Sequence, residues 1–485
     1  MVNLNEINVV KHEHQHILVD TNTTRAIFVS GRVYDIVTKL KQGREYNLVE
    51  DEYGRETVDM VLNHIQSLIE KNIIKPSDGT FYEKGMKEIK KYEEEPIDVL
   101  EGMLMVSQDC NLACKYCYGG ESGTFNHKGL MEIETAERCF RYLLSVGKDR
   151  EFQKVVFIGG EPLLNMKVIK HIVLLWEKIK ASYGDKKVFF TLTTNGLLLT
   201  QEIVEFFKKY GVGVAVSLDG PKQVHDQNRV LAGGGSTFDK VMQGIELLRK
   251  YDLPISIRTT ATKDVSFSVL HDFFEQQEFD IHTISIVDYP MVRPERCYQF
   301  GIKDYRRFLL QQREIMKKGY KDIVENNKNS FDAKQFSVSF HKSQREQGFF
   351  LCGAGNWIVS FGIDGYIYPC NRLVGHEKFR IGDLENGIDK EKVKKIFSDF
   401  LEASKNCNTC WAAARCKGRC FYERINEQDE MKEVPQELCE IYRETLAESL
   451  IFSHKVQKEM KENQMKMKEA IVRYDASNMM KEYLG

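Results

Sequence analysis

The stretch "CNLACKYCYGGESG", from Cys110 to Gly123, places three cysteines at positions 110, 114 and 117. It follows the apolar run "GMLMVSQ", which predicts a strand that ends just before the first cysteine. A structural zinc site is closed by four ligands, and His127 could supply the fourth. Three thiolates can instead hold three irons of a 4Fe–4S cluster and leave the fourth iron free for a small ligand. The residues downstream decide between these two interpretations.

Residues 100–325 alternate between short apolar runs and amphipathic stretches. Five further runs predict strands: "KVVFIGG", "VFFTLTTNG", "VGVAVSLDG", "PISIRTTAT" and "HTISIVDYP". The stretches between them predict helices, among them "NMKVIKHIVLLWEKIKASYG", "TQEIVEFFKKYG", "TFDKVMQGIELLRKYD" and "SFSVLHDFFEQQ". Apolar strands that alternate with helices predict an α/β fold, with a parallel sheet covered by helices. The three cysteines follow the first strand, and chemistry in such folds lies at the carboxyl ends of strands.

These motifs, taken in order, resemble the radical S-adenosylmethionine (SAM) superfamily. The family has an aromatic residue just before the last cysteine of its trio, as Tyr116 is here. "GGEP" follows the second strand, "TTNG" ends the third, and "SLDGPKQVHDQNR" follows the fourth. The resemblance implies a partial (β/α)6 barrel in which Cys110, Cys114 and Cys117 hold a catalytic 4Fe–4S cluster. It also implies a SAM site that includes Tyr116, Gly159, Gly160, Glu161, Pro162, Thr194, Asn195, Ser217, Asp219 and Arg229.

The same resemblance implies roles for several of these residues. "GGEP" lies where the family binds the amino group of SAM, and the Glu161 carboxylate could pair with an ammonium. Ser217 and Arg229 would lie near the SAM carboxylate and ribose, and a guanidinium fork suits a carboxylate. The reduced cluster would cleave SAM into methionine and a 5′-deoxyadenosyl radical, which abstracts a hydrogen from the substrate. The cofactors would carry the hard chemistry, while the protein positions and shields the reactants.

A second group of seven cysteines lies between residues 352 and 439. Their spacing matches the SPASM extension of radical SAM enzymes, although "CNTC" alone could belong to a zinc ribbon. The resemblance implies two auxiliary 4Fe–4S clusters, and so three clusters in all. The second would be ligated by Cys407, Cys410, Cys416 and Cys439, and the first would be held by Cys352, Cys370 and Cys420.

Two 4Fe–4S clusters need eight thiolates to ligate all of their irons, and this group of cysteines supplies seven. Some relatives place an eighth cysteine where Glu346 stands here. Either the first auxiliary cluster has an open iron, or a ligand other than cysteine closes it. Cys139 and Cys297 stand apart from both groups, and we expect ordinary semi-buried thiols there.

Residues 1–80 predict a small α+β domain, with two strands in "HQHILVDTNTTRAIFVS" and helices in "GRVYDIVTKLKQG" and "ETVDMVLNHIQSLIEKNII". This winged-helix-like layout resembles the RiPP recognition element, which captures an extended leader peptide at a sheet edge. A generic N-terminal cap is the alternative. The remaining predicted parts are a charged linker with helical character at 81–99, a radical SAM core at 100–325, a SPASM domain at 326–452 and a helical tail at 453–485.

The layout resembles maturases that join a cysteine sulfur to a carbon of another residue in ribosomal peptides, of the sactipeptide, ranthipeptide and SCIFF-maturase type. A related group forms carbon–carbon crosslinks, and this alternative stays open. Anaerobic sulfatase maturases carry an aspartate base directly after the second SPASM cysteine, where this chain has Asn371, whose amide cannot take up a proton. A non-catalytic iron–sulfur electron carrier would have no use for "GGEP". We expect a precursor peptide with a leader segment and a one-electron reductant, such as flavodoxin or ferredoxin, as partners.

The composition is that of a globular protein: 485 residues, 42% hydrophobic, with nine prolines. A formal net charge of −2 gives no electrostatic reason to expect nucleic acid. No stretch approaches about 18 uncharged apolar residues, so no membrane helix is expected. The start "MVNLNEINVVKHEHQH" lacks the features of a signal peptide. We therefore expect a cytoplasmic protein whose twelve cysteines serve metal binding or catalysis more than disulfides.

Overall fold

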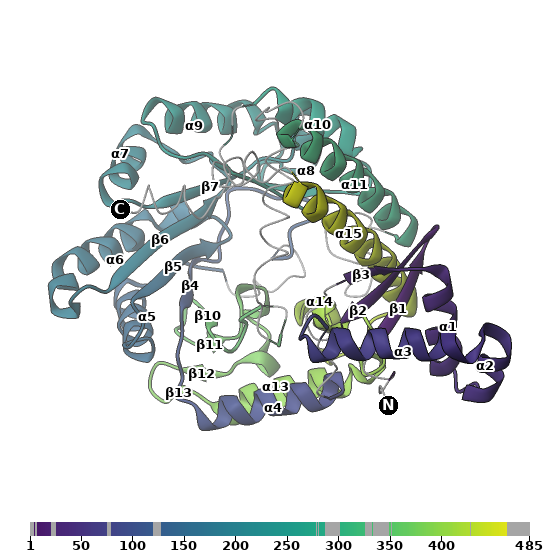
Figure 1. Cartoon of the computed structure of the whole chain (residues 1–485). Helices are drawn as coiled ribbons and strands as arrows, with labels where there is room; N and C mark the ends of the chain where they lie inside the picture. Colours follow the sequence, from purple (N-terminus) through teal and green to yellow (C-terminus); the bar gives the residue numbers. More distant parts are fainter. Residues whose placement is uncertain are drawn as a thin grey trace.

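A ten-stranded sheet forms the centre of the protein (Figure 1). The computed structural model describes residues 4, 7–20, 26–74, 79–119, 128–277, 279, 281–286, 301–324, 332, 349–350, 352–426 and 428–462. Six strands pair in parallel and in chain order: β4 Glu101–Ser107, β5 Phe152–Gly159, β6 Lys187–Thr194, β7 Gly213–Ser217, β8 Ser256–Ala261 and β9 Ile281–Ile286. The prediction of six parallel strands in an α/β fold is confirmed.

Helices cover the outer face of these strands (Figure 1). They are α5 Ile133–Val146, α6 Met166–Ile179, α7 Gln201–Tyr210, α8 Lys222–Asn228, α9 Phe238–Lys250, α10 Phe267–Glu275 and α11 Ile302–Val324. Their apolar stripes pack on the β-branched and aromatic residues of the strands. Phe140 of α5, for example, lies 6.3 Å from the ring of Trp176 on α6 and 6.1 Å from Phe190 on β6. The four helices expected from the quoted amphipathic stretches are confirmed.

The cysteine-rich C-terminal part extends the same sheet. Strand β10, Ile358–Phe361, pairs in parallel with β4. Strands β11 Ile367–Tyr368, β12 Gly382–Asp383 and β13 Gly387–Ile388 then continue it in antiparallel pairs. The region predicted as the SPASM domain is therefore joined to the radical SAM core by main-chain hydrogen bonds.

The predicted linker at 81–99 is mostly a packed helix, α4, Phe81–Glu94. A capping box starts it, because the Thr80 hydroxyl accepts from Glu83 N and the Glu83 carboxylate accepts from Thr80 N. Helix α4 lies along α13, Lys390–Glu402 (Figure 1). At Gly85 the two helices are so close that a side chain would overlap Leu401. The charged residues of this segment occupy its outer face, which explains why its sequence looks like a linker.

The N-terminal region forms an antiparallel sheet of β1 Ile7–His12, β2 Gln15–Asp20 and β3 Ala26–Val29, with helices α1 Gly31–Lys41, α2 Tyr46–Tyr53 and α3 Arg55–Glu70. The two predicted strands and two predicted helices are confirmed, and β1 and α2 are additional. The helices pack on one face of the sheet through residues such as Leu18, Ile36 and Val58.

The other face of the N-terminal sheet packs on helix α15, Gln436–Glu462, where Ile17 and Val19 contact Ile451. His12 Nε2 also lies 3.0 Å from Glu448 Oε1 of this helix. Because α15 runs past residue 452, the predicted boundary between SPASM domain and tail falls inside one helix. The rest of the predicted tail, from residue 463, lies outside the described residues.

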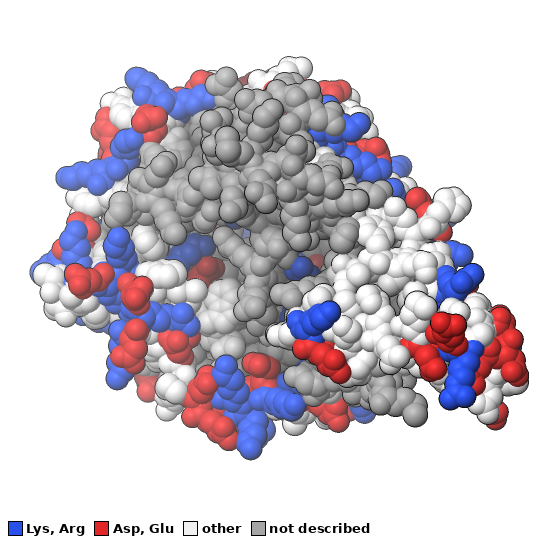
Figure 2. Space-filling view, viewed as in Figure 1, with Lys and Arg blue, Asp and Glu red and all other residues white. Residues whose placement is uncertain are grey.

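Acidic and basic side chains are interspersed on the surface shown in Figure 2. No helix within the described ranges has the length and apolarity that crossing a membrane requires.

The close contact at Gly85 predicts that Gly85→Leu lowers the thermal unfolding temperature. Forcing the side chain into the α4–α13 contact should reduce the free energy of unfolding by about 1–3 kcal/mol. Met86→Leu is the matched control, because position 86 is 39% exposed on the same helix and should change stability by less than about 0.5 kcal/mol. Equal unfolding temperatures for the two variants would contradict this packing.

Candidate active site

The three cysteines of the predicted catalytic group lie on the loop after β4. Main-chain hydrogen bonds hold this loop against the end of α8 and the segment after it: Ala113 N donates to Val230 O at 2.9 Å, and Lys115 N donates to Asn228 O at 3.0 Å. The loop therefore keeps its shape through backbone contacts, and the thiols remain available for ligation.

The three thiols lie within electrostatic reach of one another. The pKa of Cys110 is raised to about 11 and that of Cys114 to about 12, chiefly by burial, and the charge of Cys117 contributes to both shifts. Such thiols ionise when a cation binds them, and iron supplies that charge. Three thiols on one loop, one of them exposed, fit a 4Fe–4S cluster.

"GGEP" fastens the end of β5 to the start of the cysteine loop. Gly160 N donates to Ser107 O at 2.8 Å, and Glu161 N donates to Asp109 O at 2.9 Å. A side chain at Gly159 would overlap Ser107 O, and one at Gly160 would overlap Asp109 O. The two glycines thus permit a close approach between two chain segments, in addition to the approach to a ligand that we expected.

Glu161 is fully buried and binds three donors of the chain. Its carboxylate accepts from Leu163 N at 3.0 Å, Thr194 Oγ1 at 2.7 Å and Asn195 N at 2.7 Å. Burial raises its pKa to about 6, and these hydrogen bonds act in the opposite direction. The expected ammonium partner would have to share a carboxylate that already joins the ends of β5 and β6. Pro162, also buried, opens the short turn of helix that follows.

Asn195 connects "TTNG" to the cysteine loop. Its Nδ2 donates to Asn111 Oδ1 at 2.7 Å and lies 3.9 Å from Cys110 Sγ. Asn111 was not among the predicted site residues. Its position inside the cysteine motif, directly after Cys110, could have indicated that it belongs to the site.

Arg229 has a carboxylate partner within the chain. Its Nε donates to Asp219 Oδ2 at 3.0 Å, and its guanidinium carbon lies 5.4 Å from the centre of the Tyr116 ring. The Tyr116 hydroxyl also donates to Asp219 Oδ2, and Thr260 N donates to Asp219 Oδ1 at 3.0 Å. Ser217 ends β7 next to this group. The predicted residues Tyr116, Asp219 and Arg229 therefore form one buried network, with the arginine directed to Asp219.

The seven downstream thiols separate into two electrostatic groups. One group comprises Cys407, Cys410, Cys416 and Cys439. The other comprises Cys352, Cys370 and Cys420. Burial is the main cause of the raised pKa of Cys370, Cys407, Cys416, Cys420 and Cys439, and the charge of at least one other thiol of the same group also raises each of them. The assignment of each group to one auxiliary cluster stays a prediction.

A buried arginine adjoins the four-thiol group. Arg424 is 1% exposed and donates to neutral acceptors: Ser404 Oγ at 2.6 Å, Gly418 O at 3.1 Å and Lys432 O at 2.8 Å. Burial lowers its pKa to about 10, while the charges of nearby thiols raise it. A buried cation needs nearby negative charge, and thiolates that ligate a metal centre would supply it.

Zinc is the alternative occupant of the cysteine groups. Thiolates around zinc lie ~3.8 Å apart, given a Zn–S distance of about 2.3 Å and tetrahedral geometry. Over the described residues, the group of three or more ligand atoms within 4.8 Å of one another is His12, Glu13 and Glu448, and no cysteine belongs to it.

Some predicted features fall elsewhere. Cys139 is fully buried in the core on α5, so the prediction of a semi-buried thiol was wrong there. Cys297, His127 and Glu346 lie outside the described residues.

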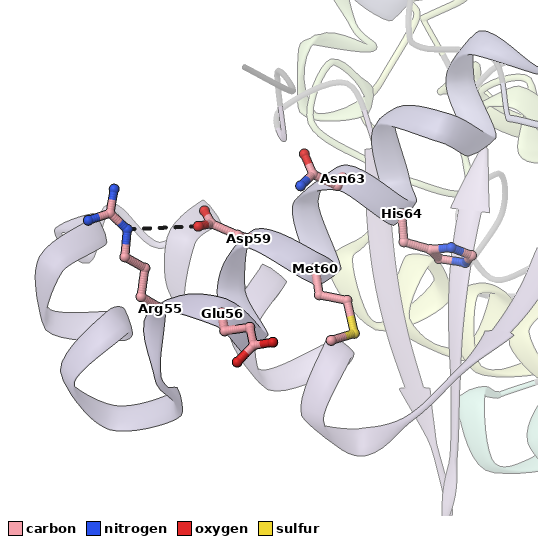
Figure 3. Close-up of a pocket in the computed structure, with 6 residues that line it drawn as sticks. All are labelled: Arg55, Glu56, Asp59, Met60, Asn63 and His64. Carbon is pink, nitrogen blue, oxygen red and sulfur yellow. Dashed lines mark ion pairs between the residues drawn. The ribbon is translucent and has the colours of Figure 1, made fainter.

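An open pocket of about 840 Å³ lies along α3, away from the cysteine loops (Figure 3). It is lined by Arg55, Glu56, Asp59, Met60, Asn63 and His64.

A family profile described as the Radical SAM superfamily matches residues 104–276, which run from β4 to just beyond α10. The chain contains a radical SAM domain. Enzymes with this domain use SAM and a 4Fe–4S cluster, for which the loop of Cys110, Cys114 and Cys117 has a suitable donor set.

The chain is also similar in sequence or structure to several known proteins. The chain is 28% identical over 358 residues to a cysteine-type anaerobic sulfatase-maturating enzyme of Clostridium perfringens, covering 70% of this chain and 92% of that protein. It is 23% identical over 449 residues to the radical SAM cyclopropyl synthase TigE of Paramaledivibacter caminithermalis, covering 86% and 88%. The structure of Streptococcus suis SuiB bound to precursor peptide SuiA matches with a TM-score of 0.50 and 15% identity, covering 89% and 98%.

Replacing Cys110, Cys114 and Cys117 together with alanine should abolish SAM cleavage by the reconstituted radical SAM enzyme. If each cysteine group holds one cluster, the parent binds about twelve irons and the variant keeps about two thirds of them. Iron analysis and a 5′-deoxyadenosine assay measure both quantities. Retained cleavage would contradict the catalytic assignment, and a parent iron content near four would contradict the auxiliary clusters.

Glu161→Gln should weaken SAM binding at least about five-fold. The neutral amide cannot form an ion pair with the SAM ammonium, and a hydrogen bond to a charged group contributes about 1.5–3 kcal/mol. Calorimetric titration of the reconstituted protein with SAM measures the change. Glu177→Gln on the exposed side of α6 is the matched control and should bind SAM like the parent. Equal affinity for all three proteins would contradict the role of Glu161.

Proposed function

We propose that this radical SAM enzyme modifies a ribosomally made precursor peptide and joins a cysteine sulfur to a carbon of a second residue. The observation that carries the proposal is the group of three thiols, Cys352, Cys370 and Cys420, beside a separate group of four. A 4Fe–4S cluster held by three thiolates keeps one iron for another ligand. A thiolate of the substrate is a chemically suitable ligand for that iron.

The N-terminal domain supports a peptide substrate. Strands β1 and β3 are the outer strands of its sheet, and within the described ranges no further strand pairs with the outer edge of either. An extended leader can add to such an edge through main-chain hydrogen bonds. SuiB, whose fold spans 89% of the chain, was solved with its precursor peptide.

The residues of this chain would divide the work as follows. SAM and the catalytic cluster, when bound, supply the one-electron chemistry that removes a hydrogen from the substrate. Asn195 and the Glu161 carboxylate hold the neighbouring strand ends beside Cys110, so the reactants meet in a fixed geometry. Asn371 offers no base, so the substrate thiol would lose its proton on binding iron, which lowers a thiol pKa.

Sulfatase maturation is the second candidate, because of the 28% identity to the Clostridium perfringens enzyme. The amide at Asn371 disfavours it. The Asn371 Nδ2 donates to the Tyr118 hydroxyl at 2.9 Å, so this side chain is held as a hydrogen-bond donor where those enzymes have a base.

Incubation with a cysteine-containing precursor peptide should give a product lighter by two hydrogens per crosslink. After reduction and iodoacetamide treatment, tandem mass spectrometry should find the crosslinked cysteine unalkylated, because a thioether has no free thiol. If every cysteine alkylates while the loss of two hydrogens persists, the bond is carbon–carbon. Conversion of a cysteine in a sulfatase-type peptide to formylglycine would support the second candidate instead.

Removing residues 1–78, which spares the Thr80 cap of α4, should weaken binding of the full precursor while leaving uncoupled SAM cleavage intact. The free edge of β3 would be lost, but the radical SAM domain would not. Fluorescence anisotropy with a labelled precursor measures the affinity, and 5′-deoxyadenosine release in its absence is the control. Unchanged affinity would show that the domain is a cap.

A further inference from the structure

A polar and aromatic bridge joins the catalytic cysteine loop to the three-thiol group. Tyr118 directly follows Cys117, and Asn371 directly follows Cys370. Their side chains meet in the hydrogen bond of 2.9 Å from Asn371 Nδ2 to Tyr118 Oη. The two cysteine segments, far apart in the chain, are thus connected beside both sets of thiols.

Arg372 is held inside this bridge. Its guanidinium carbon lies 4.2 Å from the centre of the Tyr422 ring and 5.6 Å from that of Tyr118. The two rings meet edge to face, with their centres 6.4 Å apart. Both distances are within the range of cation–π attraction, so the cation is fixed between two aromatic side chains.

The charge of Arg372 reaches the thiols of the three-thiol group. Arg372 is two residues after Cys370, and the Tyr422 ring that its guanidinium contacts is two residues after Cys420. Glu423, three residues after Cys420, pairs with Arg419 at 3.3 Å. Arg372 is therefore a fixed positive charge beside the predicted first auxiliary cluster.

We propose that Arg372 sets the reduction potential of the first auxiliary cluster, so that this cluster accepts the electron released when the sulfur–carbon bond closes. The inference rests on the proposed function for the electron's origin. The substrate thiol would lose its proton to solvent, and its thiolate would bond to the carbon radical left by hydrogen abstraction. The one surplus electron would pass to the cluster that Cys352, Cys370 and Cys420 would hold. Reduction makes the cluster more negative by one charge, and a nearby fixed cation stabilises that form and raises the potential.

The test is a redox titration of the full-length chain, followed by electron paramagnetic resonance. Every protein in the test carries alanine at positions 110, 114 and 117, which removes the paramagnetic resonance signal of the catalytic cluster. No peptide is added. Arg372→Gln should lower the midpoint potential of one auxiliary cluster, whereas Arg372→Lys, which keeps the charge, should stay closer to the parent. Arg380→Gln is the matched control, because Arg380 stacks on Tyr366, 3.1 Å from its ring centre, in the same C-terminal region.

An unchanged potential in Arg372→Gln, or an equal fall in Arg372→Lys, overturns the proposal. If Arg372→Gln does not take up auxiliary iron, Glu423→Gln provides the test instead. Loss of the Glu423 carboxylate should raise the midpoint potential of the cluster. An unchanged midpoint potential would overturn the proposal that nearby charge sets it. Since no peptide is used, the measured midpoint potentials do not depend on which substrate the enzyme modifies or which bond it forms. Failure of the proposed function is therefore seen separately, in the peptide assay.

Discussion

The parallel pairing of β10 with β4 is the constraint on which the arrangement of the site depends. Strand β4 ends at the catalytic cysteine loop, and β5, with "GGEP" at its end, lies on its other side. The loop therefore stands between the strand ends of the radical SAM domain and the cysteine-rich segment. Four register pairs, from Ile358↔Glu101 to Phe361↔Leu104, fix this order through main-chain hydrogen bonds.

Buried charge is the second constraint on the site. Glu161, Asp219, Arg229 and Arg424 are each 9% exposed or less, and each charge is matched by hydrogen bonds or by an opposite charge. Buried groups of this kind cost stability unless every partner is in place. Around the second auxiliary group, the partner of Arg424 would be thiolate charge, which links correct folding there to loading of the cluster. This coupling of metal binding to folding is general in small cysteine-rich domains.

Local patterns of the sequence predict much of this structure. Cysteine spacing indicates the three groups of thiols, and strand–helix periodicity gives all six parallel strands, because both signals are contained in short windows. The pairing of β10 with β4 joins segments more than 250 residues apart, as the pair Ser360↔Met103 shows, and no local pattern contains it. The same holds for the bond between Tyr118 and Asn371. The packing of α4 was readable in part, since Phe81, Gly85 and Ile89 recur every four residues on its buried face.

Helix α15 has a geometric consequence for the peptide. It carries Cys439 near its beginning and Ile451, which contacts the N-terminal sheet, three turns later. At 1.5 Å per residue, these two positions are about 18 Å apart along the axis. Trp411, which directly follows Cys410, packs against the same apolar group as Ile17, Val19 and Ile451. The N-terminal sheet is therefore in contact with the cysteine-rich segment itself and with the far part of the helix. A leader paired with this sheet would lie close to the cysteine-rich segment, and α15 would hold the two parts at a fixed distance from each other.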